Sequence, residues 1–256
     1  MCTLVVLRRP GHDWPLVIAA NRDEKRDRAW LPPGRHWPDR DHVIAGQDEL
    51  AGGTWLGIND DGLVAGVLNR SGTLGPAPDV RSRGELPLEA LDHAEAHVAA
   101  EALGALDPGA YRPFNLFVGD ARQAFWICSL DKNGNPGMRV EEIPEGISML
   151  TDTDRNDPAA PRVRLYLPRF EAAPPPDPEK DDWDWWQPLL ADKEFEHGVG
   201  PKGAMNIDIS LGADGEFGTV SSSLIAVPAF LSPERKTRWL FAAGAPHAAP
   251  FERVQV

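Results

Sequence analysis

The chain opens with two apolar stretches that predict a β-hairpin. Residues 3–7 (Thr-Leu-Val-Val-Leu) are β-branched or apolar, and so are most of residues 14–20. Residues 8–13 between them are polar and contain a Pro-Gly turn signal, which is typical of the connection between two antiparallel strands. If the hairpin closes within this segment, Cys2 lies roughly opposite residue 20. The Asn-Arg-Asp-Glu run that follows then begins beside Cys2.

A second pair of strand-like runs flanks the sequence Asn-Asp-Asp-Gly at residues 59–62. This pattern predicts another hairpin, with a four-residue turn. In such a hairpin Asn69 ends the second strand opposite Gly52 and Gly53, where the missing side chains leave room for a ligand. Asn59, at the turn itself, is expected to face solvent.

Helical patterns occupy three other parts of the chain. The Ala-rich segment 86–104 has a proline in its first turn and ends at a glycine, so it is predicted to form one helix. Residues 156–170 are predicted to form a second helix, and residues 181–190 a short third helix with acidic residues at its start. Further strands are expected near residues 42–45, 114–118, 123–129, 138–143, 147–151, 217–227 and 237–242. Hairpins at both ends, with helices between them, predict the α+β class, in which helices cover antiparallel sheets.

Composition favours a soluble globular protein with a single domain over residues 1–256. The net charge is −13, from 39 acidic and 26 basic residues, which argues against a nucleic-acid partner or an anionic membrane surface. No run reaches the ~18 apolar residues of a membrane span, and polar residues 8–13 interrupt any signal-peptide core. Two cysteines do not form a disulfide framework, so a cytoplasmic location is expected. Residues 171–198 are interpreted as an acidic, Pro- and Trp-rich insertion.

Cys2 is the main candidate for catalytic chemistry. Methionine aminopeptidases act before small residues, and loss of Met1 would leave a thiol and a free α-amine on one residue. An amine with a pKa of about 8 can serve as the base that activates the thiol. Arg22 would favour the thiolate, and Asp23 could hold the ammonium or the guanidinium group in place. The alternative is that Cys2 is a small buried strand residue at the end of a hairpin.

Five motifs spread over most of the chain resemble one family. They are Met1-Cys2-Thr3, Asn21-Arg22-Asp23-Glu24, the Gly-Gly-Thr-Trp-Leu-Gly run at 52–57, Arg83-Gly84-Glu85-Leu86, and Gly218-Thr219 with Ser221-Ser222. On these residues the chain resembles the family named after its Asn-Arg-Asp-Glu motif, also called the Transport and Golgi organisation protein 2 family. That family is similar to the N-terminal nucleophile (Ntn) hydrolases, which include conjugated bile acid hydrolases and penicillin V acylases.

The resemblance implies a four-layer αββα sandwich of two antiparallel sheets. It also implies that Cys2 is nucleophile and general base in one residue, that Arg22 and Asp23 support it electrostatically, and that Asn69 donates to the oxyanion. The implied reaction is hydrolysis of a non-peptide carbon–nitrogen amide bond in a small molecule, without a cofactor. The residues expected to contact the substrate are Asn21, Gly53 and Asn156.

The chain departs from the pattern of those hydrolases at two positions. They carry an asparagine after a Leu-Thr pair, where this chain has Asp152 and the nearest amide is Asn156. Many members of the family have an arginine after Gly-Thr, where this chain has Val220.

A binding function is the main alternative to catalysis. The resembling family is linked to haem handling, so the same fold could carry haem or another hydrophobic ligand without catalysis. The sequence has no Cys-x-x-Cys-His attachment motif, although a thiol at a pocket mouth can ligate iron. His93 and His97 lie four residues apart on the predicted helix, but no third ligand accompanies them, so no metal site is predicted. The cluster of Trp183, Trp185 and Trp186 is interpreted as core rather than as a ligand pocket.

Overall fold

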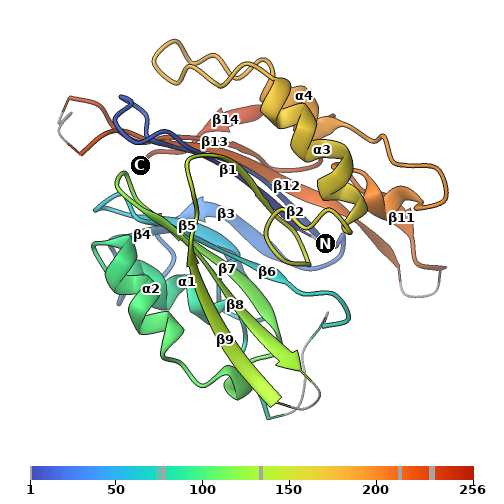
Figure 1. Ribbon diagram of the computed structural model, residues 1–256, viewed down its shortest axis with the longest axis horizontal. Helices are drawn as coiled ribbons and strands as arrows, with labels where there is room; N and C mark the ends of the chain where they lie inside the picture. The colour runs from blue at the N-terminus through green and yellow to red at the C-terminus, as the bar shows by residue number, and fades with distance from the viewer. Residues whose placement is uncertain (1, 74, 76–78, 133–134, 213–214, 231–233) are drawn as a thin grey trace. The chain divides into compact units, whose positions relative to one another are not determined.

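The computed structural model describes residues 2–73, 75, 79–132, 135–212, 215–230 and 234–256. The chain divides into two compact units, each with one antiparallel sheet and its own helices (Figure 1). Unit 1 comprises Met1–Arg28 and Glu145–Val256, and unit 2 comprises Ala29–Pro144. Within each unit helices pack on an antiparallel sheet, so the predicted α+β class is confirmed.

The sheet of unit 1 has the strand order β10-β1-β2-β12-β13-β14 over the described residues, and β11 also pairs with β12. Its strands are β1 (Thr3–Arg8), β2 (Leu16–Lys25), β10 (Gly146–Leu150), β11 (Asp208–Ser210), β12 (Glu216–Val227), β13 (Arg238–Ala242) and β14 (Phe251–Arg253). Helices α3 (Pro161–Ala172) and α4 (Trp186–Ala191) lie across one face of this sheet, as Figure 1 shows. A 3-10 turn, η2, spans Pro201–Gly203.

The N-terminal hairpin forms as predicted, with a shifted register. β1 and β2 pair from Thr3↔Asn21 to Arg8↔Leu16. One further step of this register places Cys2 opposite Arg22, two positions beyond the predicted partner. The shift arises because the Arg9 N–H donates to the Pro15 carbonyl at 2.8 Å, so the residues expected to start the second strand belong to the turn.

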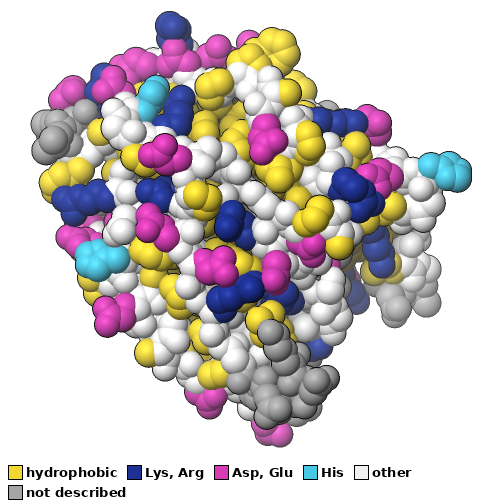
Figure 2. All heavy atoms as spheres, in the orientation of Figure 1, with side chains coloured by type: hydrophobic (Ala, Val, Ile, Leu, Met, Phe, Trp, Pro, Cys, Tyr) yellow, Lys and Arg dark blue, Asp and Glu magenta, His cyan; other side chains and the backbone are white. Residues whose placement is uncertain are grey.

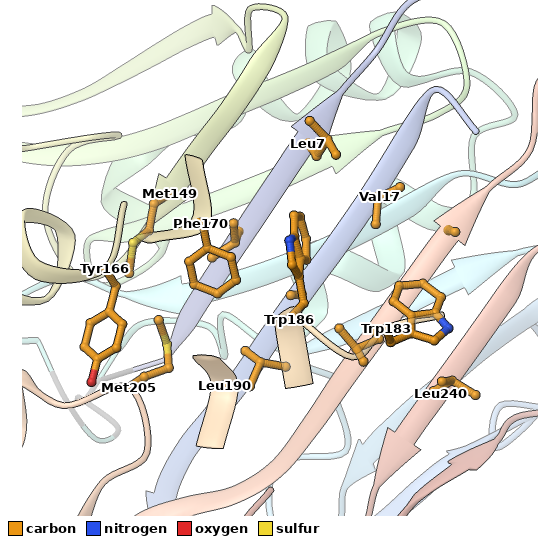
Figure 3. Close-up of a cluster of buried hydrophobic side chains, with 14 of the residues drawn as sticks. Leu7, Val17, Met149, Tyr166, Phe170, Trp183, Trp186, Leu190, Met205 and Leu240 are labelled. Atoms are coloured by element: carbon orange, nitrogen blue, oxygen red, sulfur yellow. The ribbon is translucent and has the colours of Figure 1, made fainter. Parts of the chain in front are cut away.

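Side chains alternate between the two faces of this sheet, and one face forms the core beneath α3 and α4. Figure 3 shows Leu7 and Val17 of the strands in the same buried cluster as Tyr166 and Phe170 of α3. The remaining labelled members of this core are Met149, Trp183, Trp186, Leu190, Met205 and Leu240.

The interpretation of the tryptophan cluster as core is correct for Trp183 and Trp186 and wrong for Trp185. Trp183 and Trp186 are buried, and Trp186 packs edge-on against Phe170 with ring centroids 5.2 Å apart. Trp185 between them is 59% exposed. Part of the acidic segment 171–198 therefore belongs to the core of unit 1.

In unit 2 each strand pairs with the next one along the chain, in the order β3-β4-β5-β6-β7-β8-β9. The strands are β3 (Trp30–Gly34), β4 (Val43–Asp48), β5 (Leu56–Asn59), β6 (Val64–Asn69), β7 (Phe114–Gly119), β8 (Ala124–Lys132) and β9 (Asn135–Glu142). Helices α1 (Glu85–Leu91) and α2 (Ala96–Gly104) pack on one face, and a 3-10 turn, η1, spans Pro108–Ala110.

The prediction of one helix over residues 86–104 is wrong, because side chains from the sheet cap two separate helices. Asn59 Nδ2 donates to the carbonyls of Leu91 and His93, at 2.9 and 2.7 Å, where α1 ends. The Ala96 N–H at the start of α2 donates to Asp120 Oδ2 at 2.8 Å. His93 therefore lies between the helices and does not share a helical face with His97.

Asn59 was expected to face solvent, and this expectation is also wrong. The residue is 3% exposed, and its Oδ1 accepts from the N–H groups of Asp61 and Leu63 at 3.1 and 2.9 Å. One buried side chain thus holds both the β5–β6 turn and the end of α1.

The view in Figure 2 shows acidic and basic side chains side by side, interspersed with apolar ones. Helix α3 contributes ion pairs of its own: Arg164 pairs with Glu196, and Arg169 pairs with Asp192 and Glu194. Among the described residues, no helix has both the length and the hydropathy needed to cross a membrane.

We predict that Asn59→Ala lowers the free energy of unfolding by about 2 kcal/mol, because it leaves buried carbonyl and N–H groups without partners. Urea denaturation measures the loss. The matched variant Asn59→Asp keeps the acceptor of the turn but places a buried carboxylate oxygen against the carbonyls of Leu91 and His93, so a loss at least as large is expected. A change below about 0.5 kcal/mol in both variants would contradict the capping role.

Candidate functional site

Cys2 directly precedes β1, beside the central strands of unit 1. The register brings Arg22 of β2 next to it, and Arg22 in turn pairs with Ser221 of β12. Alternation places Cys2, Arg22 and Ser221 on the sheet face opposite α3 and α4. The structure therefore unites the two residues that the sequence singled out as nucleophile and cationic support.

The Cys2 thiol is held close to β2. Its Sγ donates to the Asp23 carbonyl oxygen at 3.7 Å, and the residue is partly exposed. Burial of the sulfur raises the pKa of the Cys2 thiol above its ordinary value, and the Asp23 carboxylate adds to this. The positive charges of the amino terminus and Arg22 act in the opposite direction. The predicted effect of Arg22 is thus present, but desolvation outweighs it.

The Asp23 carboxylate lies on the other face of β2, in a buried polar network. Its Oδ2 accepts from Arg162 Nη1 at 3.0 Å, and its Oδ1 accepts from the Thr219 hydroxyl at 2.7 Å. The same Arg162 nitrogen donates to Thr3 Oγ1 at 2.6 Å, and Thr219 Oγ1 accepts from the Ile207 N–H at 2.9 Å. Through Arg162, the Asp23 carboxylate of β2 is therefore connected to Thr3 of β1, and through Thr219 it is connected to β12.

Arg162 is the functional candidate that sequence reasoning missed. Its guanidinium group is only 3% exposed, and Nη2 also donates to the Lys202 carbonyl at 3.0 Å. A signal was available, because Arg162, Tyr166 and Phe170 recur every four residues and so share the apolar stripe of α3. An arginine on such a stripe indicates a buried acidic partner.

Asn21 was expected to contact the substrate, and the structure instead gives it protein partners throughout. Its Nδ2 donates to the carbonyls of Leu190 and Met205 at 2.9 and 3.0 Å. Its Oδ1 accepts from Ser222 Oγ at 2.6 Å. Both amide hydrogens are used inside the core, so Asn21 ties β2 to the end of α4 and leaves no N–H for a ligand.

Asn156 also has a structural role where a substrate contact was expected. Its backbone is left-handed, with φ of 54°, a conformation that asparagine tolerates better than most residues. The Asn156 N–H donates to the Met149 carbonyl at 3.0 Å, and its Oδ1 accepts from the Met149 N–H at 2.6 Å. Asn156 thus ties the turn after β10 back to Met149 of that strand.

The two family departures both lie in unit 1, one just after a strand and one within a strand. Asp152 is buried just after β10. Val220 is the residue at which the β2–β12 register shifts, between Thr219 and Ser221. The bulge at Val220 lets Thr219 reach Asp23 on one face and Ser221 align with Arg22 on the other.

Gly53 and Asn69 belong to unit 2. A Cβ added at Gly53 would lie 2.5 Å from the Gly84 carbonyl carbon, so close backbone packing explains this glycine, where room for a ligand was expected. Asn69 pairs with Phe114 of β7, and alternation puts it on the face of Val67 and Ala65, which packs against α1 and α2. Its predicted role at the oxyanion stays a prediction.

Residues 1–175 of the chain match the sequence profile of the family described as Transport and Golgi organisation 2. A protein of Mus musculus named Transport and Golgi organization 2 homolog is 30% identical over 131 residues, which cover 47% of this chain and 45% of the mouse protein. The match therefore spans less than half of that relative's length.

Two solved structures resemble the whole chain. One is a Caenorhabditis elegans ortholog of N-acylethanolamine-hydrolyzing acid amidase, with a TM-score of 0.52 and 10% identity, covering 99% of this chain and 100% of that chain. The other is a mutant conjugated bile acid hydrolase from Clostridium perfringens, with a TM-score of 0.53 and 9% identity, covering 100% of this chain and 97% of that chain. At this identity the likeness shows the fold alone, which is Ntn-hydrolase-like.

We predict that Cys2 reacts faster with iodoacetamide at pH 7 than Cys128, because Cys128 is 0% exposed in β8. Because burial raises the Cys2 pKa, its labelling rate should keep increasing above the pH range of an ordinary thiol. Arg22→Ala should slow labelling at pH 7 without unfolding the chain. Peptide mass spectrometry measures both rates; equal labelling of the two cysteines in the folded protein would reject Cys2 as the nucleophile.

Proposed function

Since this chain belongs to the Transport and Golgi organisation 2 family and has an Ntn-hydrolase-like fold, we propose that it is an amide hydrolase with Cys2 as its nucleophile. The observation that carries the proposal is the pairing of Thr3 with Asn21, which brings Cys2, the residue directly before β1, next to Arg22. The proposed substrate is a non-peptide amide of a small molecule. Both structural neighbours are named for hydrolysis of such molecules, which supports this choice.

The proposed reaction begins once Met1 has been removed and the α-amine belongs to Cys2. The amine takes the thiol proton, and the thiolate attacks the carbonyl carbon of the amide. Collapse of the tetrahedral intermediate breaks the C–N bond, and the ammonium returns its proton to the leaving amine. The enzyme then carries a thioester. Water attacks this thioester, the amine accepts a proton from the water, and the carboxylic acid leaves as the thiol is restored.

The electrostatics of the site give Arg22 a defined part in this reaction. Desolvation disfavours the Cys2 thiolate, so the first step needs positive charge nearby. Arg22 supplies that charge from the outset, and the ammonium formed when the α-amine takes the thiol proton adds to it. Asp23 is proposed to keep Cys2 beside Arg22, because its backbone carbonyl accepts from the thiol and its carboxylate is fixed by Arg162. The mechanism also needs a reduced thiol, and neither Cys2 nor Cys128 forms a disulfide in the described part of the chain, so a cytoplasmic location is part of the proposal.

The direct test supplies an N-acylethanolamine and a conjugated bile acid to protein whose intact mass shows that Met1 is absent. We predict release of the amine and an acyl adduct on Cys2, both lost in Cys2→Ala. An uncleaved residue placed before Cys2 should also abolish turnover, because the amine then no longer belongs to the nucleophile. Turnover that survives Cys2→Ala would reject the proposal. Saturable haem binding that Cys2→Ala weakens, without hydrolysis of any amide, would favour a carrier instead.

The oxyanion role of Asn69 has its own test. If its amide donates to the tetrahedral intermediate, Asn69→Ala should lower the turnover of any cleaved amide by about 10²–10³. Asn69→Asp keeps the size of the side chain but removes the N–H donor, so it should be equally slow. Thermal melting supplies the control. A lower melting temperature with unchanged turnover would show that Asn69 only stabilises the end of β6.

A further inference from the structure

Arg162 joins three parts of unit 1 at the end of the sheet that carries Cys2. Nη1 donates to the Thr3 hydroxyl of β1 and to the Asp23 carboxylate of β2, and Nη2 donates to the Lys202 carbonyl of η2. The Arg162 side chain is 3% exposed and that of Asp23 is 0% exposed. This is a buried ion pair with three hydrogen-bonded anchors.

Stability alone is a weak reason for such a pair. Removing two charges from water is costly, and apolar residues of similar volume are often as good or better in the same place. The remainder of this sheet face shows that apolar packing is available, because Val5, Val17 and Leu224 fill it against α3 and α4. The Arg162–Asp23 pair lies at the end of this face, next to Thr3 of β1.

The pair is coupled to Cys2 by two routes. The first is geometric, because Thr3 follows Cys2 directly and the Asp23 backbone carbonyl accepts from the thiol. The second is electrostatic, because the Asp23 carboxylate favours the protonated thiol and the Arg162 cation offsets that charge. The other charges that act on the thiol are the amino terminus and Arg22.

We propose that Arg162 is a positioning residue for the nucleophile: it fixes the first residues of β1 against β2 and neutralises the buried charge of Asp23. This inference rests on the proposed role of Cys2. Arg22 and Arg162 then act from opposite faces of one sheet, Arg22 beside the thiol and Arg162 through Asp23 and Thr3. Arg162 itself touches no reacting atom.

The test measures the rate of Cys2 alkylation by iodoacetamide from pH 6 to 10 in four proteins: the parent, Arg162→Met, Asp23→Asn, and the double variant. Arg162→Met leaves the Asp23 charge uncompensated, so alkylation at pH 7 should fall about tenfold, which corresponds to a rise of about one unit in the thiol pKa. The double variant removes both charges and should return to within about threefold of the parent rate. A merely structural role predicts no such rescue.

Two further variants keep the test decisive. Arg164→Met alters an exposed arginine of the same helix, paired with Glu196, and should leave the alkylation profile unchanged. Arg162→Lys retains one buried charge and covers the case in which Arg162→Met does not fold. Arg162→Lys should keep the thiol pKa near that of the parent. A lysine has one nitrogen in place of two, so it cannot make all the hydrogen bonds of Arg162, and the rate of amide turnover should fall.

The outcomes separate this inference from the proposed function. If Arg162→Met is folded by thermal melting and its alkylation profile matches that of the parent, the positioning role is overturned, whatever the parent hydrolyses. If the double variant is as slow as Arg162→Met, charge compensation is overturned. If the alkylation series behaves as expected but the parent cleaves no amide, the proposed function fails and the positioning role stands.

Discussion

The alternation of side chains along β2 is the constraint on which the rest of unit 1 depends. β2 is paired with β1 on one side and β12 on the other, so its residues have fixed neighbours along most of its length. Consecutive residues of a strand point to opposite faces. Asn21 and Asp23 are therefore buried beneath the helices, while Arg22 lies beside Cys2. A motif that is continuous in sequence is divided between two faces of a sheet.

The polar groups on the helix-facing side form a connected set within an otherwise apolar core. Asn21 satisfies the carbonyls of Leu190 and Met205, and Asp23 accepts from Arg162 and Thr219. Buried polar groups are tolerated when their hydrogen bonds are made. These bonds hold α3, α4 and the segment around Met205 against the strand that neighbours the nucleophile. The helices thus contribute order to the site without contributing groups that react.

Desolvation and charge oppose each other at Cys2. Burial raises the thiol pKa, and Arg22 and the amino terminus lower it. A hydrolase of the proposed type needs the sulfur shielded from bulk water and still able to lose its proton. Arg22 and the amino terminus favour loss of the thiol proton. Arg162 pairs with the Asp23 carboxylate and so offsets the negative charge that would raise the thiol pKa further.

Local sequence patterns were sufficient to predict the hairpins, the fold class and the family. The apolar runs around polar turns correctly indicated the first hairpin, the one that ends at Asn69, and the α+β class, because strand alternation and turn residues act over a few positions. The motifs Met1–Thr3 and Asn21–Glu24 correctly indicated the family. The tryptophan pattern also correctly placed Trp183 and Trp186 in a core, since large apolar side chains gain most from burial.

Long-range contacts decided the rest. Asn59 and Asp120 end one helix and begin another inside a single helical pattern, because capping groups from the sheet compete for backbone partners of residues about 30 positions away. Gly53 is required because its backbone packs directly against that of Gly84. The side-chain amide of Asn21 and the side-chain oxygen of Asn156 are hydrogen-bonded to backbone partners that no local spacing reveals. The sequence by itself indicated most of the strands, though not β3, β11 or β14, and it indicated that Cys2 meets the Asn-Arg-Asp-Glu segment. Only the tertiary structure decided which face each of those residues occupies and that Arg162 lies beneath them, because a buried ion pair forms between elements 139 residues apart and leaves no periodic signal that names its partner.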